Sequence, residues 1–158
     1  MNKLSISSLL LLFFLIVSGC KKDDSSDNTP GLSVNINGTA WVAKITTATY
    51  QSQSNILLIM GTNSTATEGI ELGLIAGDVG TYNFSDGDAD AFGAYYAGVG
   101  DDYTSFLEDN PVGQIVITEF DKTNLTISGT FHFEAYNDKN VKKSCTDGKF
   151  NKIKYLTQ

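Results

Sequence analysis

Residues Leu125–Tyr136 read Leu-Thr-Ile-Ser-Gly-Thr-Phe-His-Phe-Glu-Ala-Tyr, and this stretch decides the fold class. Apolar or small residues alternate with polar ones along its length. Successive side chains of a strand point to opposite faces of a sheet, so the alternation predicts a long β-strand with one buried and one solvated face. The sole histidine, His132, falls on the solvated face. The expected buried face carries Leu125, Ile127, Gly129, Phe131, Phe133 and Ala135.

The chain on either side of this stretch reads as shorter strands separated by turn residues. Asn37-Gly38 is a strong hairpin signal, because both residues tolerate positive φ. Ile56–Gly61 is continuously apolar and predicts a central strand covered on both faces. Thr146-Asp147-Gly148 predicts a turn inside the last strand. The other expected strands are residues 32–36, 41–50, 68–76, 81–85, 92–97, 114–121 and 141–156.

No stretch shows helical periodicity. Short strands joined by tight turns predict a single all-β domain over residues 32–158. The expected architecture is an antiparallel β-sandwich or barrel of roughly eight to nine strands.

An apolar leader precedes this domain. Leu9–Val17 is too short to cross a bilayer, which takes roughly twenty apolar residues, and it has the position of a signal-peptide core. It ends in Val17-Ser18-Gly19-Cys20, which resembles a bacterial lipobox. The resemblance implies that residues 1–19 are removed and that the Cys20 thiol carries a diacylglyceryl group. The alternatives are a signal anchor and an ordinary signal peptide with a chance cysteine.

Residues 20–31 then form the acylated cysteine and a tether. Lys21–Pro30 contains no apolar residue, so it is expected to be disordered. Acyl chains make a durable anchor, and the expected location is the bacterial outer membrane. Cys20 followed by Lys-Lys-Asp-Asp resembles a surface-export signal of Bacteroidetes-type lipoproteins, and the periplasmic face and the cell surface both stay open.

Charge narrows the range of partners. The formal net charge is −7 and the chain contains no arginine. Phosphate backbones are bound by clustered Lys and Arg, so nucleic acid is excluded as an expected partner. Most lysines gather near the carboxyl terminus, where solvated strand edges and turns explain them. Acylation of Cys20 leaves Cys145 as a single thiol, which is either a small buried residue or a reactive one.

Two groups of residues in the irregular middle are candidate sites. Asp86, Asp88 and Asp90 place carboxylates at alternate positions, which favours either a calcium loop or a solvated acidic turn. The EF-hand pattern is absent, because Ala91 and Ala97 occupy its glycine and glutamate places. No other cofactor is expected.

Aromatic residues are the second group, and most of them are expected in the core. The candidates for an exposed patch that would bind a sugar are Tyr95, Tyr96 and Tyr103. No residue is assigned a catalytic role, because no nucleophile–base motif accompanies the single histidine.

Several short motifs follow one another in an order similar to that of a family of small, uncharacterised Bacteroidetes-type lipoproteins. The resemblance covers nearly all of the mature domain and implies location and fold type, but no activity. The motifs are Asn37–Ala43, Gly80–Tyr82, Ile115–Thr118 with Asp121, Ile127–Phe133 and Thr146–Phe150.

The sequence therefore predicts a lipid-anchored envelope lipoprotein that acts as a non-enzymatic binding module for a glycan or an envelope protein. One alternative is a structural or accessory subunit of an envelope complex. The other is a hydrolase with a pair of carboxylates, which any two loops can supply.

Overall fold

The computed structural model describes residues 29, 31–84, 91–107 and 109–158. These residues form eleven strands and one short 3-10 turn, which confirms the all-β prediction. In this part of the chain no helix has the length and apolar character needed to cross a membrane. The elements are β1 (Gly31–Ile36), β2 (Thr39–Val42), β3 (Ile45–Gln51), β4 (Ile56–Thr62), β5 (Gly69–Ile75), β6 (Gly80–Asn83), β7 (Ala91–Tyr96), β8 (Asp102–Thr104), η1 (Ser105–Leu107), β9 (Gly113–Asp121), β10 (Thr126–Tyr136) and β11 (Lys142–Thr157).

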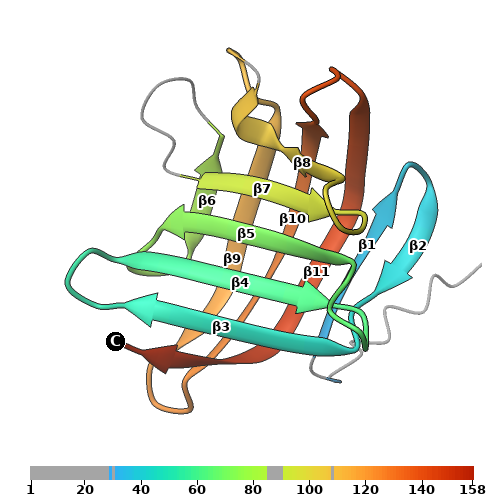
Figure 1. Ribbon diagram of the computed structural model, residues 1–158. Coiled ribbons are helices and arrows are strands. Elements are labelled where there is room, and N and C mark those ends of the chain that lie inside the picture. The colour runs from blue at the N-terminus through green and yellow to red at the C-terminus, as the bar shows by residue number, and fades with distance from the viewer. Residues whose placement is uncertain (1–28, 30, 85–90, 108) are drawn as a thin grey trace, which may run out of the picture.

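The strands lie in two layers that cross at a steep angle (Figure 1). Strands β3, β4, β5, β7 and β8 form the front layer, while β2, β1, β11, β10, β9 and β6 form the rear one. The inner faces of the two layers lie against each other, and their buried side chains form a single core. This arrangement resembles the orthogonal packing of sheets, in which strands that bend at the corners connect the layers.

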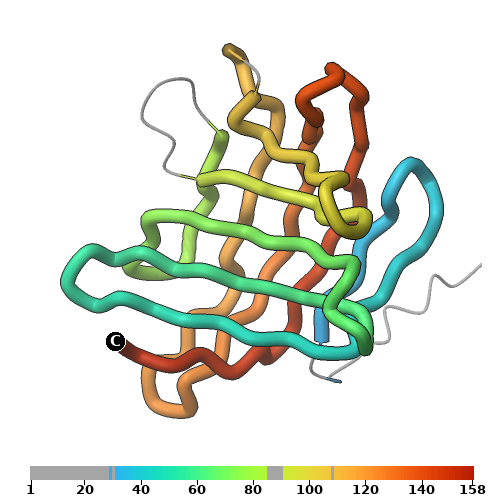
Figure 2. Tube along the Cα trace, viewed as in Figure 1, coloured from blue at the N-terminus to red at the C-terminus, as the bar shows by residue number. Residues whose placement is uncertain are grey.

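Two corners close the layers into a ring of pairings. At the first, the C-terminal end of β11 bends out of the rear layer and runs along the lower edge of β3 (Figure 2). At the second, Tyr136 of β10 pairs with Thr104 of β8. The pairing of β11 with β3 is parallel, so the prediction of a purely antiparallel sheet is wrong there. The other pairings are antiparallel, and barrel is the better description.

The expected turn at Thr146-Asp147-Gly148 is instead a β-bulge, and β11 continues through it. Two residues of β11 stand opposite one residue of β10, and Asp147 adopts a φ of 53°. A second bulge follows at Lys152, where φ is 45°. Residues that favour turns also favour bulges, and both bulges increase the bend of the strand. This bend lets one strand serve both layers.

The hairpin signal is confirmed. Asn37 and Gly38 have φ angles of 49° and 81° and join β1 to β2. Residues 41–50, however, do not form one strand. The chain leaves β2 after Val42 and starts β3 at Ile45, because β2 belongs to the rear layer and β3 to the front.

The long alternating strand is confirmed as β10. Its inward residues from Ile127 to Ala135 are buried, while Leu125 lies in the preceding turn and is 40% exposed. Strand β4 was expected to be covered on both faces, and this is wrong. Leu57 and Ile59 are fully buried, but Met60 is 39% exposed, because the outer face of a barrel layer meets solvent.

Glycines make room for aromatic rings in the core. An ideal Cβ on Gly129 would lie 2.4 Å from the ring of Phe150, and one on Gly148 would lie 2.6 Å from the ring of Phe131. Both are cross-strand pairs, in which the ring lies over the bare backbone of its partner. Gly93 receives Phe133 in the same way, from the opposite layer. The core therefore has space for these rings only because the residues opposite them are glycines, which have no side chain.

The strands of the described residues begin at Gly31, after the expected leader and tether. Within the described part of the chain, every strand pairing and the whole buried cluster fall within residues 31–157. A chain that begins at Cys20 keeps all of these contacts, so it is expected to fold on its own.

Candidate functional site

The three candidate tyrosines do not form one exposed patch. Tyr95 and Tyr96 are neighbours on β7, so their side chains point to opposite faces of the front layer. Tyr103 pairs with Tyr95 across β8 and shares its inner face. Tyr95 and Tyr103 are 7% and 4% exposed, so an exposed patch of all three is wrong. Whether any of them contacts a ligand stays a prediction.

Two of these tyrosines donate hydrogen bonds to carboxylates. The Tyr95 hydroxyl donates to Glu68 Oε1 at 2.7 Å, and the Tyr96 hydroxyl donates to Glu71 Oε2 at 2.5 Å. Burial raises the pKa of both phenols well above its usual value, and the neighbouring carboxylates raise it further. Both hydroxyls therefore stay protonated at neutral pH and act as hydrogen-bond donors.

Tyr95 reaches one edge of a recess of about 280 Å³, which we call the flank pocket. The pocket lies between the β1–β2 hairpin, the start of β5, the end of β7 and the start of β11. Trp41 supplies an indole ring, Glu68 a carboxylate and Lys143 an ammonium group. The remaining lining residues are Ile36, Asn37, Thr39, Ala40 and Tyr95.

The hairpin turn positions one wall of the flank pocket. Asn37 donates its backbone N–H to the Ser144 carbonyl oxygen at 2.8 Å, and its side-chain oxygen accepts from the Ser144 N–H at 2.9 Å. These bonds tie the turn to β11 beside Lys143. Trp41 is partly buried against the core from the edge strand β2. Neither Trp41 nor Glu68 is among the candidate site residues that the sequence pattern indicated.

A series of ring contacts and one hydrogen bond connects Lys143 with Glu68, the two charged residues of the flank pocket. The Lys143 Nζ lies 5.2 Å from the centroid of the Tyr103 ring, in a cation–π contact. The Tyr103 and Tyr95 rings lie 5.9 Å apart, and Tyr95 bonds to Glu68. The pocket thus combines an aromatic surface with one fixed acceptor and one cation. Such a set can hold a small polar molecule that has an apolar face.

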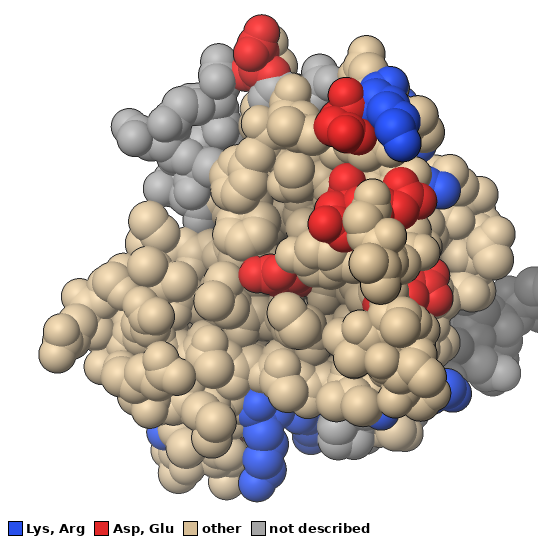
Figure 3. All heavy atoms as spheres, in the orientation of Figure 1, with Lys and Arg blue, Asp and Glu red and all other residues tan. Residues whose placement is uncertain are grey.

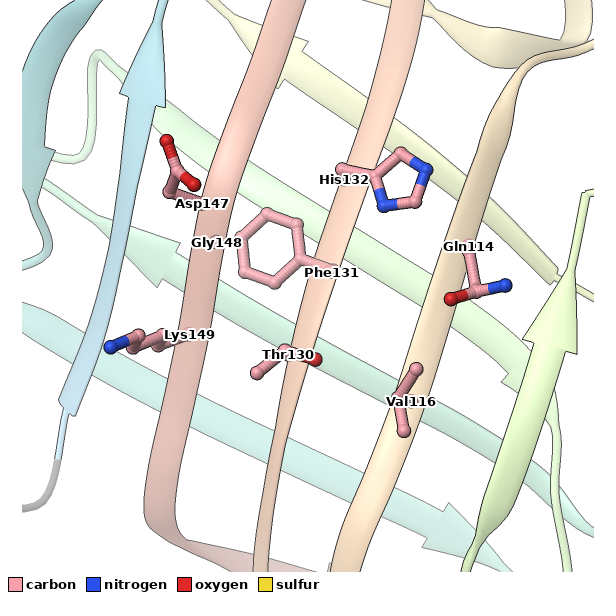
Figure 4. Close-up of a pocket in the computed structure, with 8 residues that line it drawn as sticks. All are labelled: Gln114, Val116, Thr130, Phe131, His132, Asp147, Gly148 and Lys149. Carbon is pink, nitrogen blue, oxygen red and sulfur yellow. The ribbon is translucent and has the colours of Figure 1, made fainter. Parts of the chain in front are cut away.

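A second hollow, of about 360 Å³, lies on the outer face of β9, β10 and β11 (Figure 4). His132 is exposed there, as the alternation predicted, and Gln114 stands beside it on β9. Asp147 accepts a hydrogen bond from the Asn35 amide at 3.0 Å. The hollow is part of the open outer surface of the sheet.

The calcium candidates Asp86, Asp88 and Asp90 lie outside the described residues. The described residues include no group of three or more His, Cys, Asp or Glu side chains placed to hold a metal ion. Calcium binding by the 86–90 segment therefore stays a prediction. Cys20 also lies outside the described residues, together with the leader and most of the tether.

Cys145 is buried in the core of the barrel. Its side chain is 0% exposed, and burial raises the pKa of its thiol to about 12. The nucleophilic form of cysteine is the thiolate, which this thiol does not adopt at neutral pH. The structure thus agrees with a small apolar core residue.

The fold and the flank pocket define an all-β barrel domain with one polar, aromatic-lined recess. The chain belongs to the DUF6252 family, a domain of unknown function, which it matches over residues 28–154. No curated protein and no solved structure matches the chain.

Proposed function

We propose that this protein is a lipid-anchored lipoprotein of a Bacteroidetes-type cell envelope and works as a non-enzymatic binding module. The lipobox-like Val17–Cys20 supports the anchor, and the polar tether supports a domain held at a membrane surface. The flank pocket supports the binding role. The edge strands β2 and β6 are only four residues long, which makes an accessory subunit joined through a sheet edge the less favoured alternative.

The flank pocket carries this proposal, and a saccharide is the ligand class that its chemistry fits best. Sugar rings present an apolar C–H face that packs on an indole, and hydroxyl groups that donate to a carboxylate. Trp41 and Glu68 offer these two surfaces in one recess, and Lys143 adds a donor. Tyr95 holds Glu68 by its hydrogen bond, so part of the polar surface is already oriented before a ligand arrives.

We expect a saccharide of the matching type to change the fluorescence of Trp41, which is the sole tryptophan. A glycan panel titrated against the chain from Cys20 onward measures this change. Glu68→Gln and Lys143→Ala are each expected to weaken binding about tenfold, since hydrogen bonds to charged groups contribute about 1.5–3 kcal/mol. Lys139→Ala, an exposed lysine outside the pocket, is the matched control and is expected to bind normally. A panel without any response contradicts the saccharide proposal.

We expect the anchor to depend on Cys20 alone. The amino-terminal peptide of the native protein should begin at Cys20 and carry the mass of a diacylglyceryl group. Cys20→Ser should release the protein from the membrane fraction or leave its leader attached, because a serine hydroxyl cannot form the thioether. Cys145→Ser is the matched control and should stay in the membrane fraction. Native protein with an unmodified Cys20 contradicts the anchor.

A further inference from the structure

Lysines gather at one end of the barrel. In Figure 3 one group of lysines lies at the lower end of the molecule, away from the carboxylates, and other lysines lie beside carboxylates at the upper right. We call the set at the lower end the basic pole. It stands out in a chain whose net charge is −7. The basic pole is defined as three lysines of β11, one of the β9–β10 turn and one between β2 and β3, all of them exposed: Lys149, Lys152, Lys154, Lys122 and Lys44.

A bulge brings three of these lysines to one face. Lys152 and Lys154 are two residues apart and share the outer face of β11. Lys149 is three residues from Lys152, and in a regular strand it would face the opposite way. The bulge opposite Ser128 adds one residue to β11 and turns both lysines outward. The residues between them, Phe150 and Ile153, point into the core.

In the described part of the chain, no lysine of the basic pole forms an ion pair with a carboxylate. The one ion pair in the described chain joins Lys142 to Glu134, near the opposite end of β11. Two carboxylates close to the basic pole have other partners. Glu119 accepts a hydrogen bond from Ser128 at 2.9 Å, and Asp121 accepts from the Thr123 and Asn124 backbone N–H groups.

Exposed leucines accompany these lysines. Leu125 is 40% exposed and Leu156 is 70% exposed. They belong to adjacent segments, because the Leu125 carbonyl oxygen accepts from the Tyr155 N–H at 3.0 Å. Lys154 of β11 pairs with Thr126, the residue that follows Leu125. Apolar side chains flanked by lysines are typical of surfaces that lie in the interfacial layer of a membrane.

The chain also joins the barrel at this end. The Asn151 side-chain amide donates to the Thr29 carbonyl oxygen at 3.1 Å, and Gly31 pairs with Asn151. Lys44 follows Ala43, whose N–H donates to the Leu32 carbonyl oxygen at 2.9 Å. Ten residues from Cys20 to Thr29 span at most roughly 35 Å, so a lipid on Cys20 keeps this end of the barrel near the bilayer.

We propose that the basic pole docks on an anionic phospholipid surface, with Leu125 and Leu156 entering the headgroup layer. The proposal rests on the anchoring half of the proposed function. Charge complementarity and the position of the tether both favour an anionic phospholipid surface as the binding partner. Because the tether raises the effective concentration of the surface, weak contacts are enough to hold the basic pole against it. The carboxylate-rich end of the barrel then faces away from the membrane.

Lysine acetylation on vesicles tests this orientation. The chain from Cys20 onward is coupled through that thiol to a maleimide phospholipid, and buried Cys145 stays unmodified. On vesicles with about 30 mol % phosphatidylglycerol, labelling of Lys149, Lys152 and Lys154 is expected to fall about fivefold relative to pure phosphatidylcholine. Lys139, Lys142 and Lys143 serve as internal controls and should label equally on both. High salt should restore the labelling, because it screens the attraction.

Two matched triple variants complete the test. The first variant combines Lys149→Gln, Lys152→Gln and Lys154→Gln and removes three charges from the basic pole. The second combines Lys139→Gln, Lys142→Gln and Lys143→Gln and removes three from the other end. Lys122 is the reporter in both proteins. Its protection on phosphatidylglycerol vesicles should disappear in the first variant and persist in the second. Equal labelling of both ends on anionic vesicles overturns the proposal. The coupling is chemical, so this outcome is independent of whether the native protein is acylated at Cys20.

Discussion

Gly129→Ala is expected to destabilise the barrel by about 3 kcal/mol or more, the upper range of costs for overpacking a core. An ideal Cβ at this position would lie 2.1 Å from the Val116 carbonyl oxygen and 2.4 Å from a ring carbon of Phe150. Real Cβ atoms do not approach other atoms so closely. The Val116 oxygen belongs to the backbone of β9, which pairs with β10, so it cannot move without breaking the ladder.

Urea denaturation followed by Trp41 fluorescence measures this loss. A domain of this size has a total stability of about 5–15 kcal/mol, so the variant should unfold at a much lower urea concentration or fail to fold. Gly31→Ala is the matched control. A Cβ there meets no atom within 4 Å, and the unfolding midpoint should stay near that of the parent. Parent-like stability of Gly129→Ala would show that the close crossing of β9, β10 and Phe150 is wrong.

Phe133→Ala is expected to cost about 3–5 kcal/mol, as for other large-to-small substitutions of buried rings. The Phe133 side chain is 1% exposed and lies at the centre of the core, with ring centroids 6.1 Å from Phe131 and 6.2 Å from Phe84. Its ring covers Gly93 of the opposite layer. A glycine has no side chain that could move into the space, so most of the cavity should remain.

Thermal unfolding of Phe133→Ala should therefore begin well below that of the parent. Phe106→Ala provides the comparison, because Phe106 is 54% exposed and its ring contacts Phe92 at a centroid distance of 4.7 Å. Loss of one such aromatic contact costs about 1 kcal/mol. Similar melting temperatures for the two variants would contradict the assignment of Phe133 to the centre of the core.

Local features of the fold could be predicted from the sequence. The alternation of Leu125–Tyr136 predicted both the strand and its buried face, because the period of two is a property of the extended backbone. Asn37-Gly38 predicted a hairpin, because these two residues adopt positive φ at low cost. Asp147-Gly148 shows the limit of such signals. The same conformational preference serves a turn or a bulge, and only the partner strands select between them.

The candidate site was less accessible to sequence reasoning. The flank pocket combines Trp41, Glu68 and Lys143, which are far apart in the chain and share no motif. Tyr95, Tyr96 and Tyr103 were grouped because they are close in sequence. The alternation of β7 separates Tyr95 from Tyr96, and burial in the barrel covers Tyr95 and Tyr103.

The sequence by itself determined the all-β class, the strands of the carboxyl-terminal half and the hairpin at Asn37-Gly38, since each depends on neighbouring residues and on the geometry of the extended chain. Tertiary structure alone decided the closure of the ring, the parallel pairing of β11 with β3, the flank pocket and the grouping of lysines at the basic pole. These features depend on contacts between residues distant in the chain. The energy of such contacts comes from packing and pairing across the barrel, which no local pattern of residues records.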